Sequence, residues 1–428
     1  HRVDRRQRQM CIRDSIRTVA TNTLLTNNVI TNEALVVLRN SFTLVPRALR
    51  TVDDLFGKVG YKNGSTIQVR IPVRYESATG SAINLNNSIE TSTSITLIQR
   101  NIGMNFTTKD LTLSIDLFRE RFIEPAIAQL ASDVDSDGYA AFQATNLATP
   151  GAYSSGSPAQ WVGNGTDVGT LRPFLDAKAR LEEQAAPKGD RYAALTPGAE
   201  AALVDTLKSL FQSATEIAEQ YKRGLMGLAA GLEFVESNTY PTFVSGSRSV
   251  TGSTFTSIDG TGANVTMSMT TGQTVAVNDQ FTIAGVYSIN PLTRRSTGKL
   301  QVFTVTGAAT AASSAVTLNV YPAMSVTAPD ETVSAMPVSS AAITFMGPAS
   351  TSCDVNLVWQ KNAVLVAFCD LDDDLPGAEA YVARDPETGI ALRFVRQYLS
   401  TPDVVQNRLD ILYGWKWVRP TLSCRVQG

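Results

Sequence analysis

Residues 240–283 read YPTFVSGSRSVTGSTFTSIDGTGANVTMSMTTGQTVAVNDQFTI, and they open a long stretch that is poor in charge. Of the 111 residues from 240 to 350, only eight are charged at neutral pH: Arg248, Asp259, Asp279, Arg294, Arg295, Lys299, Asp330 and Glu331. Short strand patterns, separated by Gly, Asn-Asp and Pro turns, lie at 265–269, 274–277, 281–283, 300–305 and 316–320. Since a small barrel closes such strands naturally, we predict that 240–350 is an inserted β-barrel domain.

Helical patterns precede this stretch. Thr31 is predicted to cap a short helix whose apolar face ends before Pro46. Apolar residues at three- and four-residue spacing predict a long spine helix with Pro125 as a kink: Phe118, Phe122, Ile123, Ile127, Leu130, Val134 and Phe142. Helices are also expected at 172–184 and 197–211, the second capped by Thr196, around a short buried strand at 190–196.

Strand patterns lie on both sides of the insert. Residues 67–73 alternate between apolar and polar, with Pro72 indicating an edge strand, and a second pattern covers 95–106. Together they predict a projecting two-stranded arm, which needs a partner surface because a lone hairpin is not stable in water. Further strands are expected at 232–235, 363–368, 390–399 and 407–418. The predicted fold class is therefore α+β.

Composition excludes several function classes. Lys and Arg total 37 against 39 Asp and Glu, so no overall positive charge attracts the chain to nucleic acid or an anionic membrane. The only histidine is His1, which removes the commonest general base and metal ligand. The four cysteines form no Cys-x-x-Cys pair. No apolar run reaches the roughly 18 residues of a membrane span, and we expect a soluble protein that is not exported.

Residues 1–17 stand apart from the rest. Their six arginines could form a basic arm that binds RNA or DNA. However, the segment Met10-Cys-Ile-Arg-Asp-Ser15 resembles the translated end of a transposase adapter used in sequencing libraries. We therefore expect residues 1–17 to be a non-native artefact, and no fold argument uses them.

Three side-chain groups have alternative chemical interpretations. Asp133, Asp135, Asp137 and Gly138 match half of a calcium-binding loop, but carboxylates two apart on a helix point about 200° away from each other. The acidic turn Asp370, Asp372, Asp373 and Asp374 could bind a divalent cation or be a solvated turn, which is the favoured interpretation. Tyr413, Trp415 and Trp417 could stack on bases or sugars, but packing into a core is favoured. We predict no catalytic, cofactor-binding or metal site.

The order of several short segments carries a resemblance to a known family. These segments are Asn22-Thr-Leu-Leu-Thr26, Ile30-Thr-Asn-Glu-Ala-Leu35, Met104-Asn-Phe-Thr107, Arg121-Phe-Ile-Glu-Pro-Ala126, Asp190-Arg-Tyr-Ala-Ala-Leu-Thr-Pro197, Ala230-Gly-Leu-Glu-Phe-Val-Glu-Ser-Asn238, Phe281-Thr-Ile-Ala-Gly-Val286 and Asn290-Pro-Leu-Thr293. In this order, from Ala20 onward, the sequence resembles major capsid (coat) proteins of tailed bacteriophages. The subgroup is typified by short-tailed Salmonella phages, whose coat proteins carry an inserted domain.

The resemblance implies the Hong Kong phage capsid fold and a division of the chain. Its parts would be an N-terminal arm at 18–50, an extended loop hairpin at 51–106, a peripheral domain with the spine helix at 107–170, an axial domain at 171–239, the inserted β-barrel at 240–350, and return strands of the axial and peripheral domains at 351–428. A loop between Val244 and Ala263 would contact neighbouring capsomers.

The resemblance also implies a function without catalysis. The protein would self-assemble, through a procapsid, into the icosahedral shell that encloses phage double-stranded DNA. Its partners would be its own copies in pentamers and hexamers, a scaffolding protein, a portal protein and the packaged DNA, bound without sequence specificity, with no membrane. It would be assembled in the bacterial host cytoplasm and reside in the virion. The alternatives are a secreted or tail-associated β-rich adhesin and, less favoured, a carboxylate-based hydrolase.

Overall fold

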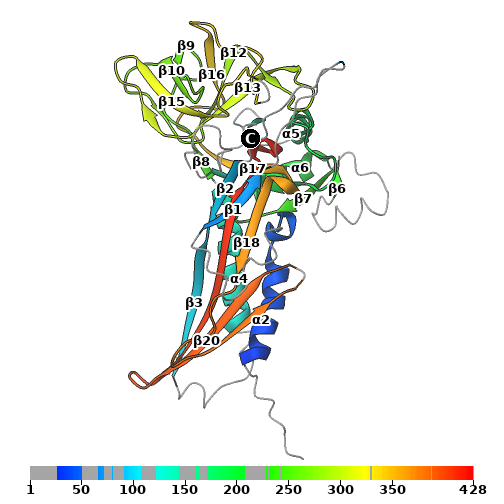
Figure 1. Ribbon diagram of the computed structural model, residues 1–428, viewed down its shortest axis with the longest axis vertical. Helices are drawn as coiled ribbons and strands as arrows, with labels where there is room; N and C mark the ends of the chain where they lie inside the picture. The colour runs from blue at the N-terminus through cyan, green and yellow to red at the C-terminus, as the bar shows by residue number, and fades with distance from the viewer. Residues whose placement is uncertain are drawn as a thin grey trace, which may run out of the picture.

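A barrel at one end and a long, narrow body give the molecule its elongated shape (Figure 1). The computed structural model describes residues 27–50, 66–71, 80, 91–107, 122–143, 161–162, 171–207, 228–229, 231–240, 242–327, 330–386 and 388–427. Residues 1–17, whose origin the sequence leaves in question, lie outside them. The described part combines helices with many strands, so the α+β class is confirmed.

Six strands close the barrel in the order β10-β15-β13-β12-β16-β9. They are β9 (Ser253–Ile258), β10 (Asn264–Ser268), β12 (Gln280–Ile289), β13 (Ser296–Val305), β15 (Ala315–Tyr321) and β16 (Ala342–Phe345), beside a small ribbon of β11 (Thr274–Val275) and β14 (Ala309–Thr310). Alternate side chains such as Val265, Met267, Phe281 and Ile283 fill its separate apolar core. The predicted barrel is present, although the sequence patterns missed β9 and β16.

Below the barrel lies a seven-stranded sheet whose main path is β4-β22-β17-β5-β7-β6, with β8 paired to β17. Its strands are β4 (Trp161–Val162), β5 (Arg191–Leu195), β6 (Leu228–Ala229), β7 (Leu232–Glu236), β8 (Thr242–Val244), β17 (Ser352–Gln360) and β22 (Ser423–Gln427). The helices α5 (Arg172–Glu183) and α6 (Pro197–Leu207) accompany it. Thr196 Oγ1 accepts a hydrogen bond from Ala199 N at 3.3 Å, which confirms the predicted cap of α6.

A second, five-stranded sheet forms the long part of the body around β21 (Val404–Trp417). One edge of β21 pairs with β3 (Ile98–Thr107), and the other pairs first with β20 (Ala391–Leu399) and then with β18 (Val364–Cys369). The last strand, β19 (Glu379–Arg384), pairs with β20. The spine helix α4 (Glu124–Gln143) packs on β21, and α2 (Asn27–Ser41) packs on α4, β19 and β20.

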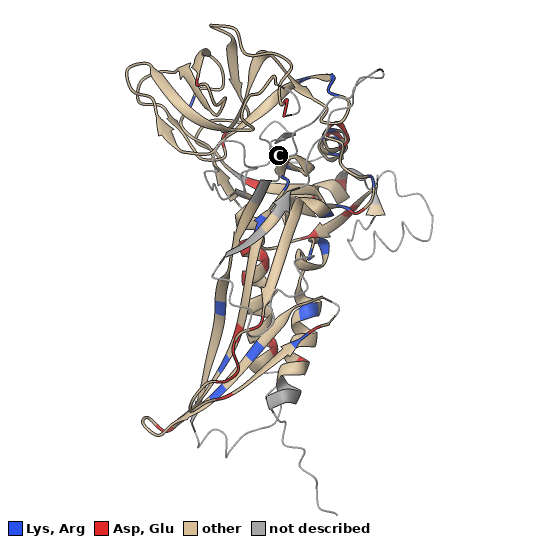
Figure 2. Ribbon diagram, viewed as in Figure 1, with Lys and Arg blue, Asp and Glu red and all other residues tan. Residues whose placement is uncertain are grey.

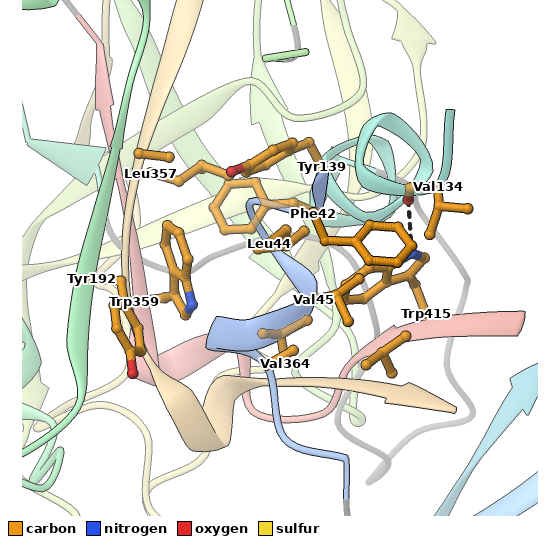
Figure 3. Packing of buried hydrophobic residues seen from close by; sticks show 14 of the residues in the cluster. Phe42, Leu44, Val45, Val134, Tyr139, Tyr192, Leu357, Trp359, Val364 and Trp415 are labelled. Atoms are coloured by element: carbon orange, nitrogen blue, oxygen red, sulfur yellow. Dashed lines mark hydrogen bonds between the residues drawn. The ribbon is translucent and has the colours of Figure 1, made fainter. Parts of the chain in front are cut away.

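One apolar core joins the two sheets and the helices. Figure 3 shows Trp415 of β21 against α4, with its indole N–H donating to the carbonyl oxygen of Val134 at 2.9 Å. Trp417 donates in the same way to Gly138 at 3.1 Å, and its ring meets Trp359 of β17 edge to face. Tyr413, Trp415 and Trp417 therefore build the core, as the sequence predicted.

The predicted two-stranded arm is only partly correct. β1 (Thr66–Ile71) pairs with β2 (Thr91–Thr96), so a hairpin exists. However, β3 leaves that hairpin and pairs along its length with residues 404–413 of β21. The periodicity of residues 95–106 correctly predicted a strand. It could not predict that this strand pairs with β21, because β21 lies about three hundred residues further along the chain.

Two smaller predictions are wrong. Thr31 lies buried inside α2 and is not its cap, because the helix begins at Asn27. The segment 244–263 is not one loop, because β9 occupies its centre as a wall of the barrel. The kink at Pro125 stays a prediction: α4 follows a π-helical turn at residues 122–123, and the part of the predicted spine helix before Phe122 lies outside the described residues.

Candidate assembly surfaces

The barrel joins the body through a two-stranded ribbon. Entry strand β8 pairs with the start of β17, the exit strand, and Ser245 continues the ladder by hydrogen bonds to Thr351. On the body side, the buried Arg425 of β22 donates to the carbonyl oxygen of Asn278 at 2.6 Å. Its guanidinium also lies over the ring of Phe243, 5.2 Å from the ring centre. One side chain of the body sheet thus reaches a turn of the barrel.

Asp279, the next residue of that turn, and Arg248 together link the entry and exit segments of the barrel. Asp279 forms an ion pair with Arg248 at 2.9 Å, and the side chains of both residues are fully buried. The other carboxylate oxygen accepts hydrogen bonds from the backbone N–H of Gly246 and Ala276. Arg248 also donates to the carbonyl oxygen of Met346 at 2.7 Å. Burial raises the pKa of Asp279, and Arg248 opposes that shift.

A weaker contact also links the barrel to the body. Lys299 of β13 forms an ion pair with Glu183 at the end of α5, at 2.5 Å, with the lysine side chain about half exposed. Sequence reasoning did not single out any of these junction residues. The available signal was that Arg248 and Asp279 are two of the few charged residues in a charge-poor stretch, which Figure 2 shows as an almost uncoloured barrel.

The β1–β2 hairpin covers the face of the five-stranded sheet opposite to α4. A small second core forms there from Ile95, Leu365, Ala367, Cys369 and Val418, with partly buried neighbours that include Val69. Gly414 makes the close approach possible, because a β-carbon at this position would stand 2.6 Å from Cγ2 of Ile95. The hairpin therefore packs directly against β21 at Gly414, the residue of that strand without a side chain.

Two features of the surface leave contacts unmade in a single subunit. Among the described residues, no strand pairs with the outer edge of β3, which is 10 residues long. An open edge of this length offers a row of backbone N–H and C=O groups to another chain. The barrel also exposes large apolar side chains: Tyr287, Leu292, Val326, Met336 and Val338.

The structure separates the carboxylates that resembled a calcium loop. Asp135 is buried and accepts hydrogen bonds from Thr43 N and Oγ1 at 2.6 and 2.8 Å. Asp137 instead forms a two-pronged ion pair with Arg100 of β3 and accepts a hydrogen bond from Tyr413. The neighbouring carboxylates thus hold different elements of the body, and they do not converge on an ion.

The acidic turn after β18 has ordinary partners. Asp370 pairs with Arg384 at 3.0 Å, and the carbonyl oxygen of Asp372 accepts a hydrogen bond from Arg393. Within the described ranges, no group of three or more His, Cys, Asp or Glu residues could hold a metal ion. Nor does any described helix have the length and apolar character needed to cross a membrane.

Comparison with known proteins identifies the chain. The model of a family described as "P22 coat protein - gene protein 5" matches residues 20–427, so this is a structural coat protein of a bacteriophage shell. The chain belongs to the P22 coat protein family. No curated protein sequence matches it significantly. The resemblance to tailed-phage major capsid proteins and their fold is thereby confirmed, and copies of the chain associate to form the capsid of the virion.

Several solved capsid structures align with most of the chain at low sequence identity. The capsid of the cyanophage P-SCSP1u is 13% identical with a TM-score of 0.43, covering 89% of this chain and 85% of that chain. The mature capsid of bacteriophage PhiM1 is 12% identical with a TM-score of 0.39, covering 85% and 82%. The procapsid of satellite phage P4, which includes its size determination protein, is 11% identical with a TM-score of 0.37, covering 99% and 96%.

Proposed function

We propose that neighbouring subunits of the shell cover the outer edge of β3 and the β1–β2 hairpin, in rings of five and six. The support comes from the 10-residue edge of β3, with which no other strand of the described residues pairs. When one surface of a subunit binds a different surface of the next subunit, the subunits form a closed ring if the rotation between neighbours is a whole fraction of a full turn. The free energies of many weak contacts between subunits add. Since about 1.4 kcal/mol changes an equilibrium constant tenfold, several such contacts together give a firm shell.

The parts of the chain would divide this work. In our proposal residues 18–50 form the N-terminal arm, 51–106 the extended loop, 107–170 the peripheral domain and 171–239 the axial domain. Residues 240–350 form the inserted barrel, which the buried Arg425 and Asp279 contacts hold in a fixed position. Residues 351–428 return to complete the axial and peripheral domains. The segment flanking β9 would reach neighbouring capsomers.

The subunit would act without catalysis and with three kinds of partner besides its copies. We infer a scaffolding protein during assembly in the host cytoplasm, a portal protein at one vertex, and packaged double-stranded DNA. The balance of 37 basic and 39 acidic residues suits a shell that holds DNA without binding its sequence, because strong affinity for phosphates would hinder packaging.

An assembly experiment tests the proposal. The full chain is expressed with its scaffolding protein, and the products are imaged by electron microscopy. Lysines in place of Asn101 and Asn105, which are exposed on β3, should block pairing at this edge. We expect the double variant to fold, by circular dichroism, but to remain as small species.

The matched control is Thr310→Lys, an exposed position on the short strand β14 beside the barrel, away from the segment flanking β9. This variant should still form shells. Normal shells from the variant with both β3 substitutions would refute the proposed role of this edge, while small discrete oligomers from the unaltered chain would refute shell formation itself.

A further inference from the structure

Lys416 occupies an unusual position for a charged residue. It lies on β21 between Trp415 and Trp417, whose rings pack toward α4, so its own side chain lies on the opposite face of the sheet. There it is paired with Leu365 across the ladder, within the small apolar core under the β1–β2 hairpin. Only 8% of the residue is exposed.

The other buried cations of the described chain all have recorded oxygen partners. Arg191 donates to Glu182 at 2.8 Å, Arg248 forms an ion pair with Asp279 at 2.9 Å, and Arg425 donates to the carbonyl oxygen of Asn278 at 2.6 Å. For Lys416, the described residues provide neither a hydrogen bond nor an ion pair. Burial lowers its pKa, and no neighbouring charge opposes that shift. The stem of Lys416 is covered, but its Nζ is not among the fully buried side-chain atoms that lack a partner in the described residues, so the ammonium group keeps some contact with solvent at the edge of this core. An ammonium group that is largely removed from water and has no partner is costly unless something completes its environment.

We propose that Lys416 is an anion site, completed by a carboxylate of a second copy of this chain when the shell forms. The proposal rests on the proposed contact between the β1–β2 hairpin and neighbouring subunits. A second copy is the favoured occupant because a coat subunit is surrounded by identical copies. Its surface also carries exposed carboxylates, such as Asp373 and Asp374, for which no cation partner is recorded among the described residues.

The arrangement gives the cation opposite effects in the two states of the protein. In the free subunit the ammonium group destabilises the small apolar core, and it therefore weakens the packing of the β1–β2 hairpin on the sheet. In the shell, a carboxylate at hydrogen-bonding distance would convert the same group into a contact between subunits. Lys416 would thus favour the assembled state over the isolated one.

The substitution Lys416→Met separates these effects, because methionine keeps the apolar stem and removes the charge. We expect the free subunit to unfold at a higher urea concentration than the unaltered chain. We also expect its shells, assembled from purified protein without nucleic acid, to dissociate at a subunit concentration at least tenfold higher. Lys361→Met, at a half-buried position between β17 and β18, is the matched control and should leave the shells unchanged.

Three results with Lys416→Met would overturn the inference. A more stable subunit with equally stable shells would mean that Lys416 is only a tolerated buried cation. A less stable subunit would mean that the ammonium group is already satisfied within its own chain. Weakening seen only in DNA-filled shells would assign the site to phosphate and reject a carboxylate of a second copy. If the unaltered chain formed no shells, the proposed function would fail first.

A measurement on the unaltered chain does not depend on a variant that folds. Competitive acylation, read by mass spectrometry of the peptide containing Lys416, gives the pKa of this amine in the free subunit and in the shell. We expect a higher pKa in the shell, because a carboxylate stabilises the ammonium form. Steric protection alone would slow acylation at all pH values and leave the pKa unchanged or lower, which would refute the site.

Discussion

Gly138 of α4 lies against the indole ring of Trp415 with no space for another carbon atom between them. A β-carbon on Gly138 would stand 2.8 Å from Cε2 of Trp415 and 2.6 Å from Cδ2 of Leu44. Trp417, two residues further along β21, donates a hydrogen bond to the carbonyl oxygen of the same Gly138. The spine helix therefore approaches β21 through a residue without a side chain, and this contact sets the spacing of the core.

Gly138→Ala should destabilise the subunit by about 1–3 kcal/mol, because the rigid indole ring cannot yield to the added methyl group. Urea unfolding of the free subunit measures this effect. Gly198→Ala is the matched control: Gly198 is also helical, but a β-carbon there would meet nothing within 4 Å. Alanine at that position should be neutral or stabilising by up to about 1 kcal/mol. Equal effects of the two substitutions would contradict the packing argument.

Arg425→Met should loosen the junction between barrel and body. The variant loses the hydrogen bond to Asn278 O, and a bond of this kind to a charged group contributes about 1.5–3 kcal/mol. Hydrogen exchange should accelerate at residues 243–246 and 278–280, while β10 and β15 keep their protection. Lys299→Met removes only the exposed contact with Glu183, worth about 0–1 kcal/mol, and serves as the comparison. Unchanged hydrogen exchange at residues 243–246 and 278–280 in Arg425→Met would refute the role of Arg425 at the junction.

Arg248→Met should destabilise the barrel by about 3–5 kcal/mol, because it leaves the Asp279 carboxylate buried and without its cation. The double variant Arg248→Met with Asp279→Asn should recover part of this loss. The amide oxygen can still accept hydrogen bonds from Gly246 N and Ala276 N. Hydrogen exchange within β10 and β15 is the suitable measurement, since the chain's four tryptophans lie outside residues 240–350. A double variant less stable than the single one would contradict this account.

Asp259 should make the turn between β9 and β10 sensitive to acid. Its carboxylate accepts hydrogen bonds from Thr261 Oγ1 at 2.6 Å and Asn264 Nδ2 at 2.8 Å, and these lower its pKa from 3.8 to about 2. Because the folded pKa is the lower one, the stabilisation is complete above about pH 4 and is lost as the pH falls through 2. Exchange of the Ala263 and Asn264 amides should rise over this range beyond the intrinsic change. Asp259→Asn should flatten the profile, and an unchanged profile would refute the assignment.

Local sequence patterns predicted many elements but not how they pair. The alternation in residues 265–269 and 316–320 predicted strands of the barrel, and the continuous apolar run 363–368 predicted the buried strand β18. β9 and β16 escaped because they are short and rich in Thr and Ser or Ala, which gives a weak pattern. The Arg425–Asn278 contact could not be predicted, because it joins residues from separate units far apart in the chain.

The sequence alone determined the kinds of element and the presence of a charge-poor stretch with short barrel strands, because periodicity and turn chemistry act over a few residues. It also determined that residues 133–138 could not converge on an ion while they remained helical. Only the tertiary structure decided that β3 joins β21, that Gly138 spaces the helix from the sheet, and that Lys416 is buried. These depend on contacts between segments hundreds of residues apart, where the gain from packing outweighs any local preference.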